Sequence, residues 1–128
     1  MKEIYIKNAP KINSHYAPAV LSTDGKCLYI SGQLPIDPVS RSMCRGDIRE
    51  QTLAALMNVE RLVKEAGGDR TNIVRTTAYI DTMDNWEPVN EVYADFFGER
   101  KPARTILCVK EIHFGLKIEI DAIAEVGR

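Results

Sequence analysis

Residues 116–125 read LKIEIDAIAE, a run in which apolar and charged residues alternate. Side chains on a β-strand point alternately to its two faces, so this period of two predicts a half-buried strand. One face would carry Leu116, Ile118, Ile120, Ala122 and Ala124, and the other would carry Lys117, Glu119, Asp121 and Glu125. We therefore predict a strand over 116–125 with an apolar face on the core and a charged face away from it.

The same alternation predicts the other strands of a sheet. Residues 72–81 would place Val74, Thr76, Ala78 and Ile80 on one face, and Arg75, Thr77, Tyr79 and Asp81 on the other. Two short strands within 18–33 are joined by a tight turn at Asp24-Gly25, because glycine adopts a positive φ at little cost. In the second of them, Leu28, Ile30 and Gly32 are expected to share the inner face. A strand at 103–110, followed by a turn containing Gly115, and a weak N-terminal strand at about 3–6 complete the set.

Two segments have the signals of amphipathic helices. For residues 48–66, Asp47 and Glu50 have the spacing of a capping box, and Gly67-Gly68 ends the helix. For residues 85–98, Asp84 and Glu87 have the same spacing. The apolar stripes are Leu56, Val59, Val63 and Ala66 in the first helix and Trp86, Val89, Tyr93 and Phe96 in the second. The order β-β-β-α-β-α-β-β predicts one α+β domain over residues 1–128, a single mixed sheet with both helices on one face.

The sheet face without helices is expected to carry both polar and apolar side chains. They are Ser31, Tyr79, Arg104, Ile106, Cys108 and Glu119. Such a face could lie in water, or other copies of the chain could cover it, since symmetric self-association is common. The sequence leaves both arrangements open.

Charge and cysteine content exclude several classes of protein. Seventeen basic and eighteen acidic residues give a net charge of −1, which argues against RNA or DNA binding through bulk charge. Cys27, Cys44 and Cys108 form no C-x-x-C pair, and His15 and His113 lie far apart, so neither a disulfide scaffold nor a zinc site is expected. No signal peptide or membrane span is apparent, which makes the cytosol the simplest compartment.

Four motifs, in order, resemble those of the RidA/YjgF/UK114 family. Residues 31–38 (SGQLPIDP) are similar to S-G-Q-x-P-x-D-P, and residues 89–97 (VNEVYADFF) to V-N-x-x-Y-x-x-F-F. Residues 102–105 (PART) resemble P-A-R-[ST], and residues 117–124 (KIEIDAIA) resemble K-I-E-I-E-A-I-A. Together the motifs extend over nearly the whole chain.

The resemblance implies a chorismate-mutase-like fold, assembled as a homotrimer with ligand sites at subunit interfaces. It also implies hydrolysis of 2-imino or enamine acids to 2-oxo acids and ammonia without a cofactor or a metal. By the same resemblance, Arg104 would bind the substrate carboxylate and Glu119 would hold the attacking water. The positions that complete or border the pocket are matched by Tyr16, Ser31, Gly32 and Asn90.

These residue types suit that chemistry. A planar guanidinium grips a carboxylate through two parallel hydrogen bonds, and a carboxylate can act as general base and acid. Each residue also has an ordinary structural interpretation: Arg104 as an ion-pair residue on a strand, and Glu119 as part of a solvated charged face. The motif context favours the ligand role for Arg104.

The chain departs from the family pattern around the expected pocket. Residues 14–18 read SHYAP, so only Tyr16 matches there. Ile106 stands where a cysteine is common, and residues 112–115 (IHFG) replace a Leu-Pro turn. These departures keep two alternatives open. One is a deaminase for another substrate, such as an aminomuconate or aminoacrylate type or a bulkier molecule near Phe114; the other is a trimeric protein that binds small metabolites without turnover.

Overall fold

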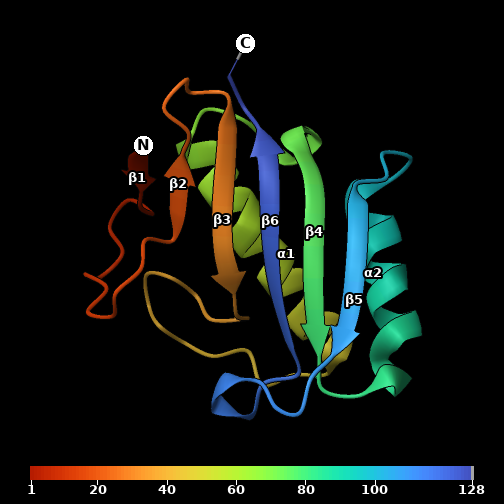
Figure 1. Ribbon diagram of the computed structural model, residues 1–128. Coiled ribbons are helices and arrows are strands. Elements are labelled where there is room, and N and C mark those ends of the chain that lie inside the picture. Colours follow the sequence, from red (N-terminus) through yellow and green to blue (C-terminus); the bar gives the residue numbers. More distant parts are fainter. Residues whose placement is uncertain (128) are drawn as a thin grey trace.

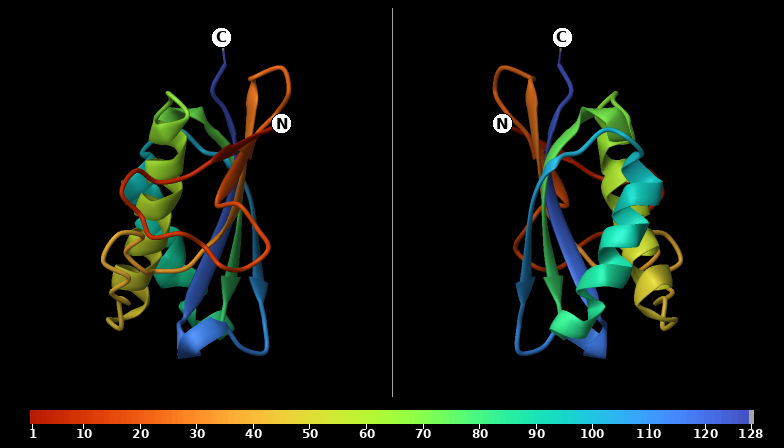
Figure 2. Two further views of the ribbon diagram at one scale, coloured as in Figure 1. Left: turned by 90° about the vertical axis from the view of Figure 1, so that its left-hand side faces the viewer. Right: turned by 90° about the vertical axis from the view of Figure 1, so that its right-hand side faces the viewer.

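The computed structural model describes residues 1–127 and contains a six-stranded mixed sheet with two helices on one face (Figures 1 and 2). The order of elements and the α+β class agree with the prediction. The strands are β1 (Lys2–Ile4), β2 (Ala19–Leu21), β3 (Cys27–Gln33), β4 (Ile73–Ile80), β5 (Ala103–Cys108) and β6 (Ile118–Glu125). The helices are α1 (Ile48–Glu65) and α2 (Trp86–Phe97), and short 3₁₀ turns lie at Arg70–Asn72, Met83–Asn85 and His113–Gly115.

The last strand of the chain lies inside the sheet. The spatial order is β1-β2-β3-β6-β4-β5, so β6 pairs with both β3 and β4. Among the strands that the structure describes, only β4 and β5 run parallel, and α2 forms the crossover connection that parallel strands require. Ile118, Ile120 and Ala124 of β6 are almost fully buried against the helices, as the alternation predicted. β6 begins two residues later than expected, because a 3₁₀ turn occupies His113–Gly115.

The N-cap predicted for α1 is confirmed, although only one of the two bonds of its predicted capping box is present among residues 1–127. The Asp47 carboxylate accepts a hydrogen bond from the Glu50 N–H at 2.9 Å, which caps α1. The capping box predicted for α2 is wrong. Asp84 lies in the 3₁₀ turn before α2, where its own N–H donates to Thr82 Oγ1 at 3.3 Å, and the α2 N-cap Asn85 makes no side-chain capping bond.

Two β-bulges change which side chains face the core. A register shift between Ile73 and Arg75 on β4 leaves Ile73 6% exposed and Val74 39% exposed, so the prediction that Val74 faces inward is wrong. A second shift, between Ile30 and Gln33 on β3, turns Gly32 away from the core. Its Cα instead faces the side chain of Glu119.

Strand β5 has the opposite facing from the one predicted. In the parallel ladder Arg104 is paired with Thr76, and Thr76 is buried beneath α2, where its hydroxyl meets that of Tyr93 at 2.9 Å. Paired residues share a face, so Arg104 and Ile106 lie on the helix side, and Ile106 packs on the core. The expectation that Arg104, Ile106 and Cys108 lie on the open face is therefore wrong.

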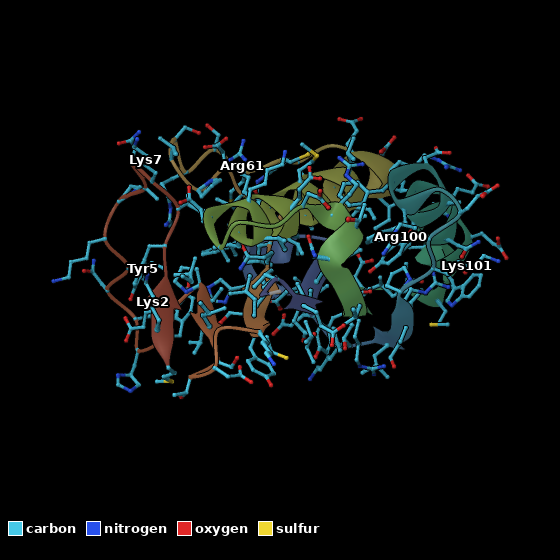
Figure 3. All side chains as sticks on the ribbon, turned by 90° about the horizontal axis from the view of Figure 1, so that it is seen from above. Lys2, Tyr5, Lys7, Arg61, Arg100 and Lys101 are labelled. Atoms are coloured by element: carbon cyan, nitrogen blue, oxygen red, sulfur yellow. The ribbon has the colours of Figure 1, made fainter. Side chains whose placement is uncertain are left out.

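The open face of the sheet carries the other half of the predicted set. Tyr79 and Glu119 are paired across β4 and β6. Both helices lie on the other face of the sheet (Figures 2 and 3). The Tyr79 hydroxyl donates a hydrogen bond to Asp121 Oδ2 at 2.9 Å. Tyr29 and Leu107 expose about half of their surface, 50% and 46%. No helix among residues 1–127 is long and apolar enough to cross a membrane.

Candidate functional site

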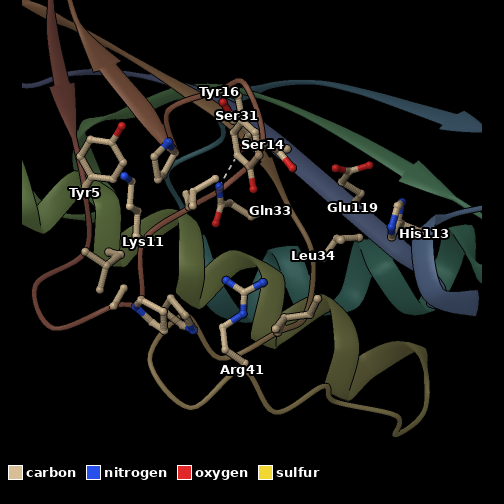
Figure 4. Close-up of a pocket in the computed structure, with 18 of the residues that line it drawn as sticks. Tyr5, Lys11, Ser14, Tyr16, Ser31, Gln33, Leu34, Arg41, His113 and Glu119 are labelled. Carbon is tan, nitrogen blue, oxygen red and sulfur yellow. Dashed lines mark hydrogen bonds between the residues drawn. The ribbon is translucent and has the colours of Figure 1, made fainter.

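A cleft of about 970 Å³ opens at the end of β3 where the chain leaves the sheet (Figure 4). Its walls come from segments far apart in sequence: the loop before β2, the end of β3 with the loop that follows, and the turn before β6. Four of the six predicted site residues line it, and they are Tyr16, Ser31, Gly32 and Glu119. The other two, Asn90 and Arg104, lie outside the cleft.

Glu119 is the only carboxylate among the described residues that line the cleft. It projects from β6 toward the cleft, with His113 beside it in Figure 4. The absence of a side chain at Gly32 makes room for it, because a Cβ at Gly32 would lie 2.8 Å from Glu119 Cδ and still closer to one carboxylate oxygen. The bulge in β3 and the alternation of β6 thus bring the two residues together.

The surroundings of Glu119 favour its protonated form. Partial burial raises the pKa of its carboxyl above the ordinary value, and the negative charge of Asp121 on the same strand raises it further. The nearby His113 acts in the opposite direction, because a positive charge stabilises the carboxylate. A raised pKa makes the carboxylate a stronger base, and the protonated form can then return the proton.

Ser31 connects β3 to the loop before β2 through two hydrogen bonds. Its hydroxyl donates a hydrogen bond to the Ala17 carbonyl at 2.7 Å, and its N–H donates to the Pro18 carbonyl at 2.9 Å. These bonds fasten the loop that presents Tyr16, whose side chain is 54% exposed at the cleft. Gln33 closes the same corner by donating from Nε2 to the Ser31 carbonyl at 2.9 Å (Figure 4).

Arg104 and Asn90 form a second cluster on the helix side of the sheet. Arg104 Nη1 donates to Asn90 Oδ1 at 3.1 Å, and its guanidinium lies 5.0 Å and 5.4 Å from the ring centres of Tyr93 and Trp86. Both rings belong to α2, so the helix orients the guanidinium through one hydrogen bond and two cation–π contacts. No ion pair joins Arg104 to a carboxylate of residues 1–127.

The two clusters lie on opposite faces of the sheet. Arg104 is on the helix face at the β5 edge, whereas Glu119 is on the open face of β6. One copy of the chain therefore holds a carboxylate cleft and an oriented guanidinium without bringing them together.

Some cleft residues had no signal in the sequence. Lys11 and Arg41 line the cleft although they belong to no recognised motif. Among residues 1–127, Arg41 is one of three non-glycine residues with a positive φ, and nothing in the sequence around it predicts that conformation. Within residues 1–127, no cluster of three or more histidine, cysteine, aspartate or glutamate side chains is arranged to hold a metal ion.

Comparison with known proteins finds relatives that match almost the whole chain. Residues 6–126 match the family model described as Endoribonuclease L-PSP. A RutC family protein of Pyrococcus horikoshii is 40% identical over 97% of this chain and 98% of its own length. The 2-iminobutanoate/2-iminopropanoate deaminase of Rattus norvegicus is 36% identical over 98% of this chain and 90% of its own.

Solved structures extend the likeness to the fold. The crystal structure of E. coli TdcF with bound serine superposes with a TM-score of 0.88 and 30% identity. The match covers 99% of this chain and all of TdcF.

Proposed function

The chain belongs to the endoribonuclease L-PSP family, which includes RidA and YjgF, and from this premise we propose that it hydrolyses 2-imino acids to 2-oxo acids and ammonia. The observation that carries the proposal is the half-buried Glu119 carboxyl, set against Gly32 in a cleft that raises its pKa. A deaminase of this kind needs a group that first takes a proton from water and later returns it, and such a carboxyl meets that need.

The proposed reaction requires only water and proton transfer. Glu119 takes a proton from a water molecule as the water oxygen bonds to the carbon of the protonated imine, which gives a neutral tetrahedral aminoalcohol. Glu119 then passes this proton to the nitrogen, the C–N bond breaks with its electron pair on nitrogen, and ammonia leaves. The remaining hydroxyl releases its proton to solvent and becomes the carbonyl of the 2-oxo acid. Each turnover consumes one water and regenerates the carboxylate.

Arg104 is proposed to hold the substrate carboxylate at the interface between two copies, in a homotrimer. The support is geometric: the guanidinium is oriented by Asn90 and α2 but faces away from the cleft of its own chain. A neighbouring copy in a cyclic assembly would supply the missing half, because a heterologous interface joins two different surfaces of the same protein. The open sheet face, with Tyr29 and Leu107 half exposed, offers apolar area for such contacts.

The relatives support a substrate with an α-carboxylate. The rat relative is named for the deamination of two small 2-imino acids, and TdcF was solved with serine, an α-amino acid. An imino acid shares the carboxylate and the adjoining carbon of an amino acid. RNA cleavage, to which the family name refers, is not proposed, because the chain carries a net charge of −1 and so offers no bulk attraction for a polyanion.

The test is the hydrolysis of freshly generated 2-iminobutanoate, with semicarbazide to trap the remaining imine. Wild type is expected to accelerate release of 2-oxobutanoate, whereas Arg104→Ala and Glu119→Gln are expected to lose that activity. Glu125→Gln, at the exposed end of the same strand β6, is the matched control and should retain it. Retention of binding with no turnover by folded wild type would instead indicate a protein that binds metabolites, and full turnover by Glu119→Gln would remove Glu119 from the mechanism.

A further inference from the structure

The cleft that holds Glu119 also contains two cationic side chains that the proposed hydrolysis does not use. Lys11 comes from the loop before β2, and Arg41 comes from the loop between β3 and α1. In Figure 4 the Arg41 guanidinium points into the cleft from the wall opposite Tyr16 and Ser31. Both residues line the same cleft from separate loops, so the cleft carries two cationic side chains.

Arg41 is held in this position at a cost to the backbone. Its φ is 67°, in the left-handed region that a side chain with a Cβ disfavours by about 1–2 kcal/mol. Asp37 fixes the turn: its carbonyl accepts from the Arg41 N–H at 2.9 Å, and its Oδ1 accepts from the N–H groups of Val39 and Ser40, both at 2.9 Å. Residues held in sparsely populated backbone conformations cluster at active sites, ligand clamps and switch regions.

The charges in the cleft are not balanced by the protein. Neither Lys11 nor Arg41 takes part in an ion pair within residues 1–127. Glu119 is the single carboxylate among the described lining residues, and it is the proposed proton carrier. A ligand that approached Glu119 with its reacting carbon would place its far end among uncompensated cations, where an anion is stabilised.

The size of the cleft agrees with a ligand longer than the smallest imino acids. A volume of about 970 Å³ lies at the upper end of the range that holds drug-sized ligands.

We propose that the preferred substrate is a 2-imino acid with a second carboxylate at the end of its side chain, which Arg41 binds with help from Lys11. This inference rests on the proposed deaminase function and specifies its substrate class. The α-carboxylate would still belong to Arg104 of a second copy, so the ligand would be held at both ends. Arg41 would thus decide specificity without taking part in proton transfer.

The kinetic test compares 2-iminoglutarate with 2-iminopentanoate, which has the same carbon chain without the second carboxylate. Wild type is expected to show a kcat/KM for the dicarboxylate about tenfold or more higher, as for a charge-assisted contact. Arg41→Gly should abolish that preference and fold well, because glycine tolerates the φ of 67°. Arg41→Lys should keep part of the preference, and Lys26→Ala, an exposed cation outside the cleft, should keep all of it.

The outcomes separate this inference from the proposed function. Turnover of both imines with equal kcat/KM, or a preference that survives in Arg41→Gly, overturns the inference while the deaminase proposal stands. If Arg41→Gly lowers kcat/KM equally for both substrates, the inference is also overturned, and Arg41 is assigned to the α-carboxylate that the two substrates share. If neither imine is turned over, calorimetry with 2-oxoglutarate and 2-oxopentanoate decides. Tighter binding of 2-oxoglutarate that Arg41→Gly removes supports the second-carboxylate site, whereas equal binding of the two acids refutes it.

Discussion

Replacing Gly32 by alanine should move the Glu119 carboxylate while leaving the stability of the fold almost unchanged. The added Cβ would lie 2.8 Å from Glu119 Cδ, well inside van der Waals contact. The φ of Gly32 lies outside the left-handed region, so alanine brings no backbone strain. The contact is with the end of a flexible side chain, which can rotate away. We expect the thermal midpoint to change little, and Glu119 to be displaced by about an ångström.

A displacement of that size has a large effect on catalysis. Misplacing a catalytic group by about 1 Å can lower a rate by roughly 100-fold, because the reacting atoms leave the near-attack geometry. Gly32→Ala should therefore lower kcat for 2-imino acid hydrolysis by about 100-fold. KM should change less, because the proposed carboxylate anchor Arg104 lies on another surface.

Gly25→Ala provides the opposite control. Gly25 has a φ of 76° in the turn between β2 and β3 and nothing within 4 Å of its would-be Cβ. Alanine there should lower the free energy of unfolding by about 1 kcal/mol and leave kcat unchanged. The assays are urea unfolding and steady-state release of 2-oxo acid. Wild-type kcat in a folded Gly32→Ala protein would refute the reasoning, since Glu119 would then need no defined position.

Three further substitutions test other contacts. Asp121→Asn removes a negative charge that raises the pKa of Glu119, so the acidic limb of the kcat/KM profile should move to lower pH, and an unmoved limb would show that Asp121 does not tune the carboxyl. Asn90→Ala removes the hydrogen bond that orients the Arg104 guanidinium, so it should raise KM roughly tenfold with a smaller effect on kcat. A large fall in kcat with an unchanged KM would contradict this positioning role. Arg70→Met leaves the buried Glu60 carboxylate without its main partner and should lower the free energy of unfolding at pH 7 by about 1–2 kcal/mol, allowing for the partial exposure of Arg70. Because Arg70 holds the pKa of Glu60 below its ordinary value of 4.5, the difference from wild type in urea unfolding should shrink as the pH falls below 4.5, and a constant difference would count against the ion pair.

The sheet could be predicted from the sequence wherever alternation was strong. In β6, charged and apolar residues differ sharply, so the inner face of Ile118 and Ile120 and the outer face of Glu119 were both correct. Bulges at Ile73–Arg75 and Ile30–Gln33 could not be predicted, because an extra residue in one strand leaves no mark on its composition.

The sheet face on which Arg104 lies could not be predicted from the sequence. β5 is an edge strand whose two sides are both of mixed polarity, so its alternation does not fix which side is buried. Its facing follows from the pairing of Arg104 with Thr76 in the parallel ladder, a tertiary contact. The motifs therefore identified Arg104 and Glu119 as candidate site residues, while the structure places them on opposite faces. Arg41 could not be predicted as a cleft residue, because its positive φ comes from the turn around Asp37.

The central claim, that Arg104 of one copy completes the Glu119 cleft of another, is tested most directly by mixing two inactive variants. Arg104→Ala and Glu119→Gln are unfolded together, refolded at equal concentration, and assayed for 2-iminobutanoate hydrolysis, with mixed oligomers verified by native mass spectrometry. If each site joins two copies of a cyclic assembly, random mixing restores about one quarter of the wild-type activity. Mixed oligomers without any recovered activity would contradict the claim, because each chain would then need both residues for its own site.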